Sequence, residues 1–340
     1  MSEEATRANG LGPDAAKAEA VRGALIPWFE ENGRDLPWRR TRDPWRVLVS
    51  EVMLQQIQVK RAIPFYGRFL ERFPTVETLA EAPLSDAIRA WGDLGRYRRV
   101  VSLHRTASLI VEEHGGEVPS DPEALLRLPG VGPYTAGAVA CFAFERDAAF
   151  FDTNMHRVLH RVFFGPDVPK AAAKPKAVME LAGQMVPRGG GWAWNQAVME
   201  FGALRCTARK PGCQGCPLAE YCRSEPEILD LLSSIPRGVA RGTDGSYEDS
   251  NRYLRGRVLA RLRESRDGMM MPGLAHGLRG DGASVGLPRL REVVESLERD
   301  GLARTTGEPI HEEPAGAVAE RRAPYAAGPD DLSRLRVALP

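Results

Sequence analysis

Apolar side chains recur at helical spacing through the first two thirds of the chain. The segments 45–52 and 136–143 each repeat apolar residues every three or four positions, which places them on one face of an α-helix. The residues that carry this spacing are Trp45, Leu48, Val49, Val52, Ala136, Val139, Ala140 and Ala143. Alternating strand patterns are few, and Pro and Gly interrupt the helical segments. The pattern therefore predicts an all-α fold for about residues 19–224.

A second region follows residues 236–250, which have the Gly- and Ser-containing composition of a linker. Beyond it, apolar spacing predicts two amphipathic helices, over residues 254–262 and 290–297. Asp300-Gly301 is expected to end the second helix. From residue 311 the chain is rich in Ala, Pro, Gly and charge, which predicts disorder.

The composition adds a cellular setting. The 340 residues carry a formal net charge of +1, so the overall charge does not indicate a nucleic-acid partner. Residues 96–105 hold four arginines and no acid, and either a solvated helix face or a DNA contact fits them. Residues 1–20 lack the apolar core of a secretory signal, and no run approaches the ~18 apolar residues of a membrane helix. We expect a soluble protein in the reducing cytoplasm.

Four of the five cysteines lie within one short segment. They are Cys206, Cys213, Cys216 and Cys222. Thiolates at this spacing can converge on one centre, because the loop between them is too short to reach elsewhere. Tetrahedral zinc and a cubane iron–sulfur cluster both take four such ligands, and the spacing leaves both open. A reducing setting disfavours disulfides, and the remaining Cys141 is expected to be a buried packing residue.

The string LPGVGPYTA at residues 128–136 predicts a tight turn between two helices. Upstream, Asp121-Pro122 has the capping side chain and the proline of a helix start, and the second helix is expected to begin near Tyr134. Gly130 and Gly132 would let backbone N–H groups point outward at that helix N-terminus, which is an arrangement that binds phosphate. A plain helix–turn–helix with glycine caps is the alternative.

Together these features resemble the helix-hairpin-helix DNA glycosylases and, among them, the adenine DNA glycosylases of the MutY type. The resemblance covers about residues 20–223. Besides the hairpin and the cysteine loop, the motifs that carry it are Leu36-Pro37-Trp38-Arg39, Ser50-Glu51-Val52-Met53-Leu54-Gln55-Gln56, Asp152-Thr153-Asn154 and Asn195-Gln196-Ala197-Val198-Met199-Glu200. The resemblance implies a two-domain helical fold, a [4Fe–4S] cluster on the four cysteines and a monomer. It also implies double-stranded DNA with a mismatch or an oxidised guanine as partner, and a cytoplasmic, nucleoid-associated location.

The expected domains are a disordered N-terminal tail (1–18), a cluster domain (19–44 and 145–224), a six-helix domain with the hairpin (45–144), a linker (225–250), a winged-helix-like extension (251–310) and a disordered tail (311–340). The extension resembles that of short actinobacterial members of the family, which lack a Nudix-like domain. Residues 291–295 resemble part of a Nudix signature but lack its following glycine, so an ordinary amphipathic helix is expected there. Five arginines around the first helix of the extension either meet DNA phosphates or form a solvated face: Arg252, Arg255, Arg257, Arg261 and Arg263.

Two carboxylates have the contrasting settings that base excision requires. Breaking an N-glycosidic bond passes through an oxocarbenium-like transition state, which needs an acid on the leaving base and an anion near the sugar. Glu51 lies inside an apolar helical pattern, so desolvation is expected to raise its pKa and keep it a proton donor. Asp152 precedes a helix expected to begin near Asn154, where backbone N–H groups keep a carboxylate ionised. A structural buried acid and a simple helix cap are the alternatives.

The resemblance assigns roles to these and further residues. It makes Glu51 the acid that protonates adenine and Asp152 the residue that stabilises the sugar cation. Tyr134 and Asn154 match residues that support this centre. Tyr134 stands where strand-cleaving relatives have a lysine, so a monofunctional enzyme is expected. Gln56 matches a residue that enters the duplex vacated by the flipped base. The residues that match the lining of the adenine pocket are Arg34, Trp38, Arg39 and Glu200.

Two positions depart from the family pattern. The usual Gln-Gln-Thr is Gln55-Gln56-Ile57 here, and an arginine, Arg96, replaces the aromatic wedge that the family often carries at this site. Because arginine can stack on a base and contact phosphate, a DNA-binding role for Arg96 is retained. The expected function is hydrolytic removal of adenine opposite 8-oxoguanine or guanine. The alternatives are a related glycosylase for thymine or uracil opposite guanine, and a non-catalytic iron–sulfur DNA-binding regulator.

Overall fold

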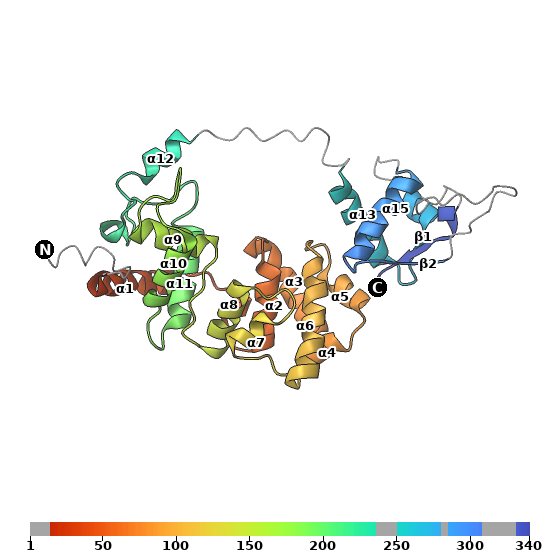
Figure 1. The fold of residues 1–340 in the computed structure, drawn as a ribbon, viewed down its shortest axis with the longest axis horizontal. Helices are drawn as coiled ribbons and strands as arrows, with labels where there is room; N and C mark the ends of the chain where they lie inside the picture. The colour runs from red at the N-terminus through yellow and green to blue at the C-terminus, as the bar shows by residue number, and fades with distance from the viewer. Residues whose placement is uncertain (1–13, 236–249, 280–284, 308–330) are drawn as a thin grey trace, which may run out of the picture. The chain divides into compact units, whose positions relative to one another are not determined.

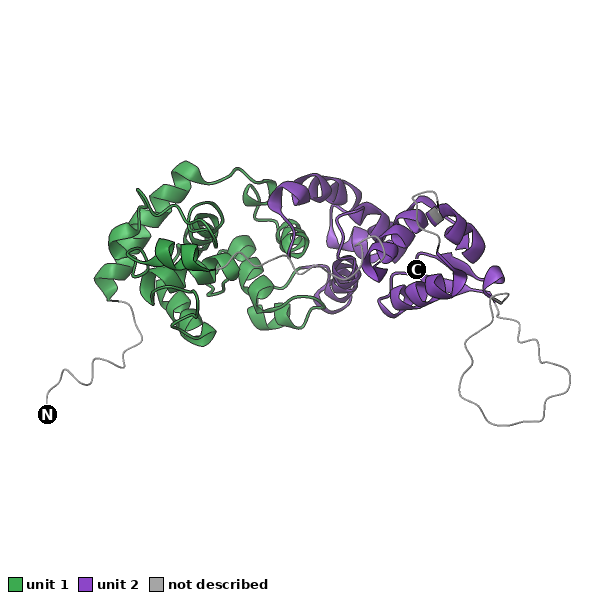
Figure 2. Ribbon diagram, turned by 90° about the horizontal axis from the view of Figure 1, so that it is seen from above, with its two compact units in different colours: residues 1–55, 118–238 green, residues 56–117, 239–340 purple. Residues whose placement is uncertain are grey.

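The computed structural model of the 340-residue chain describes residues 14–235, 250–279, 285–307 and 331–340 (Figure 1). Its contacts divide the chain into two units, residues 1–55 with 118–238 and residues 56–117 with 239–340 (Figure 2). Each unit therefore combines segments that are distant in sequence. The domain boundaries expected from the sequence stay a prediction. Within the described ranges, no helix has both the length and the apolar character needed to span a bilayer.

The described part of the first unit consists of helices and connecting loops (Figure 1). Its elements are α1 (Ala15–Asn32), η3 (Pro37–Arg39), α2 (Pro44–Leu54), α7 (Pro122–Leu126), α8 (Pro133–Phe144), α9 (Thr153–Phe163), α10 (Pro175–Met185), α11 (Gly191–Leu204), η4 (Ala219–Tyr221) and α12 (Ile228–Ser234). Helix α1 packs on α11, α9 packs on α10 and α11, and α2 packs on α8. These contacts bring the predicted catalytic segments, which lie on α2, α8 and α9, into one unit.

The second unit joins a helical segment to the C-terminal extension. The helices of the first segment are α3 (Val59–Arg72), α4 (Val76–Ala80), α5 (Leu84–Trp91) and α6 (Arg98–His114). The elements of the extension are α13 (Asn251–Glu264), β1 (Met269–Met270), α14 (Met271–Arg279), α15 (Leu287–Arg299), β2 (Arg304–Thr306), η6 (Asp331–Arg334) and β3 (Arg336–Ala338). Its antiparallel sheet has the strand order β1-β3-β2, with Val337 opposite both Met269 and Thr305. Three helices with a small antiparallel sheet form the expected winged-helix-like extension.

Local sequence accounts for the helix boundaries. Asp43 caps α2 by accepting a hydrogen bond from the backbone N–H of Arg46 at 3.0 Å, and Pro44 occupies the first turn. Asp121 caps α7 in the same way through Ala124. Gly301, with φ of 69°, follows α15 where the sequence predicts its end. The apolar positions predicted for α2, α8, α13 and α15 are buried, which confirms those four helices.

Three expectations about order are wrong in part. Residues 331–340 were expected to be disordered, but β3 is the central strand of the sheet and Val337 is fully buried. The segment is short and charged, so its strand pairing becomes visible only when β1 and β2 are in place. Helix α12 lies within the expected linker, and α1 begins at Ala15, inside the expected N-terminal tail. The remaining parts of those expectations, residues 1–13, 236–249 and 311–330, lie outside the described residues.

Candidate active site and metal centre

Glu51 lies on α2 and is only 5% exposed, because α8 packs over this face of the helix. Burial disfavours the carboxylate and raises the pKa of Glu51 to about 7. A hydrogen bond from Tyr134 opposes that shift, the negative charge of Asp152 adds to it and the positive charge of Arg39 opposes it. The structure thus gives Glu51 the raised pKa that its apolar sequence setting predicts. Near neutral pH, Glu51 is an available proton donor.

Tyr134 is in the first turn of α8 and its hydroxyl donates a hydrogen bond to the Glu51 carboxyl group. Its ring packs edge-on against Phe150, with the ring centroids 5.5 Å apart. Desolvation, together with the negative charges of Glu51 and Asp152, raises the pKa of Tyr134 well above its ordinary value. The phenol therefore stays neutral and acts as a donor.

Asp152 is the N-cap of α9. Its Oδ1 accepts hydrogen bonds from the backbone N–H groups of Asn154 at 2.9 Å and Met155 at 2.7 Å, and its Oδ2 accepts one from Asn154 Nδ2 at 2.8 Å. These bonds and the positive end of the helix dipole stabilise the ionised carboxylate. The predicted cap is confirmed. One carboxyl group in the site is desolvated, and the other accepts three hydrogen bonds at a helix N-terminus.

A buried arginine that the sequence pattern does not single out links Asn154 to the cysteine loop. Arg157 Nη2 donates to Asn154 Oδ1 at 2.8 Å and to the Gly202 carbonyl at 2.7 Å, while Nε donates to the Cys206 carbonyl at 2.7 Å. Gly202 allows this close approach, since a Cβ atom there would lie 2.7 Å from the Asn154 carbonyl oxygen. The only sequence signal was the position of Arg157 one turn after Asn154. Asp152, Asn154, Arg157 and Cys206 thus form one hydrogen-bonded series.

The residues expected to line the adenine pocket form a buried ion-pair cluster. Glu200 is fully buried and accepts hydrogen bonds from Arg34 Nε at 2.7 Å, Arg34 Nη2 at 2.7 Å and Arg39 Nη2 at 2.8 Å. Burial opposes ionisation of Glu200, but the hydrogen bonds from Arg34 and Arg39 outweigh it and lower the pKa to about 2. Arg39 Nε also donates to Gln196, and Trp38 is buried in the preceding turn. The structure brings these residues together, and their contact with a base stays a prediction.

The two hairpin glycines differ in conformation. Gly130 has φ of 78°, a left-handed conformation that favours glycine. Gly132 is the N-cap of α8 with φ of −94°, and a Cβ atom there would meet no other heavy atom within 4 Å. The fold therefore explains why residue 130 is a glycine but not why residue 132 is one. The second fits a backbone that must approach a ligand closely, as the phosphate prediction requires.

Gln56 and Arg96 are both exposed and both have left-handed backbone conformations. Their φ angles are 57° and 50°, and Glu145 is the other non-glycine residue with positive φ in the described ranges. Such a conformation costs about 1–3 kcal/mol and persists where the surroundings over-determine it, often at functional sites. Two of these three residues are thus the ones expected to enter the DNA duplex.

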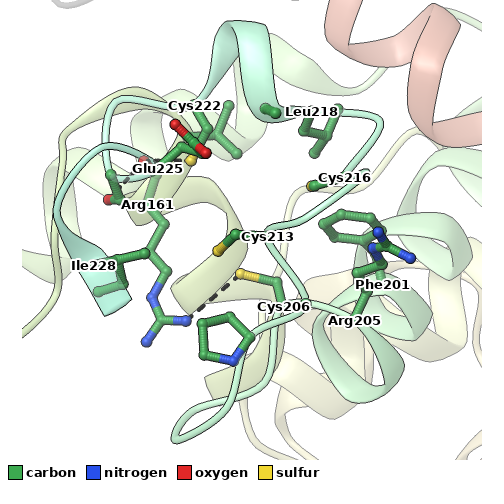
Figure 3. A pocket seen from close by; sticks show the side chains of 15 residues that line it. Arg161, Phe201, Arg205, Cys206, Cys213, Cys216, Leu218, Cys222, Glu225 and Ile228 are labelled. Carbon is green, nitrogen blue, oxygen red and sulfur yellow. Dashed lines mark hydrogen bonds between the residues drawn. The ribbon is translucent and has the colours of Figure 1, made fainter. Parts of the chain in front are cut away.

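The four clustered cysteines line one pocket, together with Arg161, Phe201, Leu218 and Ile228 (Figure 3). Their thiols are free of disulfides. Among the described residues, no three His, Cys, Asp or Glu side chains lie close enough to hold a single metal ion. Four thiols that line one pocket are the donor set that both a zinc ion and a cubane iron–sulfur cluster take.

Arg161 borders this pocket on the side of α9 (Figure 3). Its Nη1 lies 3.7 Å from Cys206 Sγ and 2.9 Å from the Thr207 carbonyl, and its Nε donates to Asp167 at 2.6 Å. This second arginine therefore fixes the start of the cysteine loop and faces a ligand sulfur. The fifth cysteine, Cys141, is fully buried in α8, and burial raises the pKa of its thiol to about 11. Cys141 is a packing residue, as predicted.

Comparison with known families accounts for both the hairpin and the cysteine loop. Residues 49–187 match the family model of the HhH-GPD superfamily of base excision DNA repair proteins. Residues 206–222 match the iron–sulfur binding domain of endonuclease III. The second match shows an iron–sulfur cluster of the [4Fe–4S] type, and the matched segment begins at Cys206 and ends at Cys222.

Individual proteins are similar over more than half of the chain. An adenine DNA glycosylase of Mycolicibacterium smegmatis is 39% identical over 242 residues, which cover 71% of this chain and 80% of that protein. The solved structure of a thermostable thymine-DNA glycosylase is 32% identical with a TM-score of 0.59, and the match covers 63% of this chain and all of that one. A trapped endonuclease III–DNA covalent intermediate is 24% identical with a TM-score of 0.54, covering 62% of this chain and 97% of that one, and shows the fold alone.

Proposed function

Because the chain belongs to the adenine DNA glycosylase family, within the HhH-GPD superfamily of base excision DNA repair proteins, we propose that it releases adenine paired with 8-oxoguanine or guanine in double-stranded DNA. The observation that carries the proposal is the pair of carboxyl groups in contrasting settings. Burial raises the pKa of Glu51 to about 7, and Asp152 accepts three hydrogen bonds at the N-terminus of α9. Hydrolysis of an N-glycosidic bond needs both.

Glu51 is proposed to protonate a ring nitrogen of the adenine. A protonated base is a better leaving group, and a donor with a pKa near the working pH transfers its proton efficiently. Tyr134 holds the Glu51 carboxyl group in place through the hydrogen bond that its hydroxyl donates. As the proton leaves Glu51, this hydrogen bond and the charge of Arg39 stabilise the carboxylate that forms.

Asp152 is proposed to stabilise the positive charge that develops on the sugar as the bond to the base breaks. The bonds from Asn154 and Met155 fix its carboxylate before the reaction, so little reorganisation is needed. A water molecule then supplies the oxygen that replaces the base. Tyr134 has no amine to form a Schiff base, so the DNA strand stays intact.

DNA is proposed to be held through the hairpin and opened by the two strained residues. Backbone N–H groups near Gly132, at the N-terminus of α8, suit a phosphate. Gln56 and Arg96 are exposed in left-handed turns and are proposed to enter the duplex as the adenine leaves the stack. We further propose that the enzyme works as a monomer on the DNA of the cytoplasm.

Cys206, Cys213, Cys216 and Cys222 would hold the [4Fe–4S] cluster, which supplies a cross-link for the loop that contacts Arg157 and Arg161. Protein purified anaerobically should be brown and contain about four irons per chain, as cubane ligation requires. Cys213→Ser should lower the iron content, whereas the matched control Cys141→Ala should leave it unchanged. Stoichiometric zinc would contradict this assignment.

Base release from a panel of duplexes tests the function. Adenine, thymine, uracil or hypoxanthine is placed opposite guanine or 8-oxoguanine, and the free base is identified after a single turnover. We expect adenine release from both opposing bases, with an intact abasic strand until alkali is added. Release of thymine or uracil instead would favour the activity named for the structurally similar thymine-DNA glycosylase. Borohydride trapping of the wild-type protein would reject a monofunctional mechanism.

A further inference from the structure

The loop of residues 92–97, called the wedge loop below, joins α5 to α6 in the second unit and carries Arg96. Its φ angles are 63° at Gly92, 82° at Gly95 and 50° at Arg96. Inside the unit, Tyr97 donates its hydroxyl to the Gly92 carbonyl at 2.8 Å, and Trp91 Nε1 donates to the Gly95 carbonyl at 2.9 Å. These bonds close the loop but leave Arg96 exposed and strained.

The C-terminal extension contacts both ends of this loop. Helix α13 packs on α5, and its Arg263 guanidinium lies over the Tyr97 ring, 5.8 Å from the centroid. The same guanidinium reaches the other end of the loop, where a methyl group on Gly92 would lie 3.8 Å from its Nη1. One residue after α13, the Ser265 carbonyl accepts a hydrogen bond from Arg89 of α5 at 3.3 Å. Arg263 thus lies beside the two residues joined by the Tyr97–Gly92 hydrogen bond.

A second contact holds the residue that follows the wedge loop. Asp300, at the end of α15, accepts a hydrogen bond from Arg98 Nε at 2.9 Å and pairs with Arg255 of α13. The Asp300 side chain is only 11% exposed and is held by Arg255 as well, whereas the Arg98 side chain is 78% exposed, so solvent screens the Arg98 end of this contact. Next to it, a methyl group on Gly301 would lie 3.7 Å from Val101 of α6.

The arginines of α13 also make protein contacts. Arg255 pairs with Asp300 and Ser296, Arg257 donates to the Tyr253 hydroxyl, and Arg261 donates to the Gly277 carbonyl. Contacts with DNA phosphates are therefore not needed to explain the arginines at 255, 257, 261 and 263 of α13. Their contacts tie the extension together and join it to α5, α6 and the wedge loop.

We propose that the extension is a brace for the wedge loop, and that Arg263 and Asp300 are positioning residues that keep Arg96 presented for entry into DNA. The functional half of this inference rests on the proposed function, in which Arg96 enters the duplex. A strained conformation persists only where neighbouring contacts determine it, and these two residues supply contacts at both ends of the loop. Their loss would let the loop relax and would scatter the Arg96 side chain.

Limited trypsin digestion tests the brace without any assay of activity. Trypsin cleaves after Arg96 only when the surrounding chain opens locally, and mass spectrometry follows the cut between Arg96 and Tyr97. Arg263→Ala and Asp300→Asn should each speed this cut by about threefold or more, since each removes a contact that holds the loop. Arg263→Lys, which keeps a cation over the ring, should restore most of the protection.

Arg291→Ala is the matched control, because Arg291 donates hydrogen bonds to Glu295 and Thr305, which both lie within the extension and outside the wedge loop. It should leave the cut after Arg96 at the wild-type rate. Unchanged cleavage in both Arg263→Ala and Asp300→Asn would overturn the brace, whatever the activity. If Arg291→Ala accelerated cleavage equally, the faster cleavage would reflect a general loss of stability in the extension, and the assignment of Arg263 and Asp300 as positioning residues would fail.

Single-turnover excision then tests positioning. On a duplex with adenine opposite 8-oxoguanine, Arg263→Ala should release adenine about five- to tenfold more slowly than the wild type. Adenine opposite an abasic site costs less to extrude, so its release should slow much less. Combined with Arg96→Ala, Arg263→Ala should cause no further loss, because it acts through that side chain. Equal losses on both duplexes, or additive losses, would reject the positioning role. If the wild-type protein released no adenine, the proposed function would be wrong. The rate of the trypsin cut after Arg96 would still show whether the extension braces the loop.

Discussion

In the first unit, Glu51 is 5% exposed and Asp152 accepts three hydrogen bonds from Asn154 and Met155. In the second unit, Arg96 is exposed, and its backbone is in a left-handed conformation with φ of 50°. The proposed catalytic centre buries Glu51 and fixes the partly buried Asp152 through hydrogen bonds. The wedge loop presents the exposed Arg96 side chain on a strained backbone, and contacts from Arg263 and Asp300 of the same unit hold the two ends of that loop.

The difference reflects the two tasks. A proton donor and a fixed anion need a low dielectric and preorganised dipoles, which only a buried site provides. A residue that enters DNA must stay accessible, so its precision has to come from the backbone and from contacts behind the loop. Changes in the centre should therefore alter chemistry, and changes around the loop should alter access to the base.

The largest expected effect is on chemistry. Asp152→Asn keeps the shape of the side chain but removes the anion, and Glu51→Gln removes the proton donor. Each should slow single-turnover adenine release by about 100-fold or more, because preorganised electrostatic stabilisation is lost. Both variants should still bind duplex DNA, since the hairpin is unaffected. Near wild-type excision by either one would mean that these carboxyl groups do not carry the reaction.

Glu51→Gln should also stabilise the fold above neutral pH. The folded-state pKa of Glu51 is about 7 against an ordinary 4.5, so the stability associated with its proton is complete below about pH 4.5 and is lost as pH rises through 7. The variant should have a higher free energy of unfolding at pH 8, on the order of 2 kcal/mol, and the advantage should vanish at pH 4. Urea titrations at both pH values measure it, and equal stability at pH 8 would contradict a desolvated Glu51.

Arg157→Ala tests whether the hydrogen bonds behind Asp152 matter. The change removes the donor that holds Asn154 Oδ1 and the Cys206 carbonyl, and loss of one such positioning contact should slow excision by about tenfold. Arg205→Ala is the control, because Arg205 donates a hydrogen bond to the Gln214 carbonyl in the same cysteine loop, whereas Arg157 is the arginine that holds Asn154 Oδ1. The idea fails if both variants, at wild-type iron content, slow excision equally.

The smallest effects separate the two hairpin glycines. Gly130→Ala places a Cβ on a left-handed residue and should lower stability by about 1 kcal/mol as well as DNA affinity. Gly132→Ala meets open space in the protein, so it should leave thermal stability unchanged and weaken binding only a few-fold, for matched and mismatched duplexes alike. Binding titrations and thermal melts measure both. Selective loss on mismatched DNA would contradict a phosphate contact.

Local features of this protein were predictable from sequence. The caps Asp121 and Asp152 and the buried faces of α13 and α15 depend on residues within one or two turns of one another. The four clustered cysteines were equally visible, because their short spacing leaves few ways to arrange them. Their metal was not, since spacing alone suits zinc as well as iron.

Tertiary structure decided what depends on distant neighbours. A helical pattern shows that Glu51 is on a buried face, but its pKa of about 7 depends on α8 and Tyr134, which pack over that face. Arg157 meets a carbonyl 49 residues away, and β3 pairs with strands far earlier in the chain. Side-chain periodicity reports which surface is covered and carries no information on what covers it. The brace at Arg263 and Tyr97, like the electrostatics at Glu51, exists only once the helices have packed.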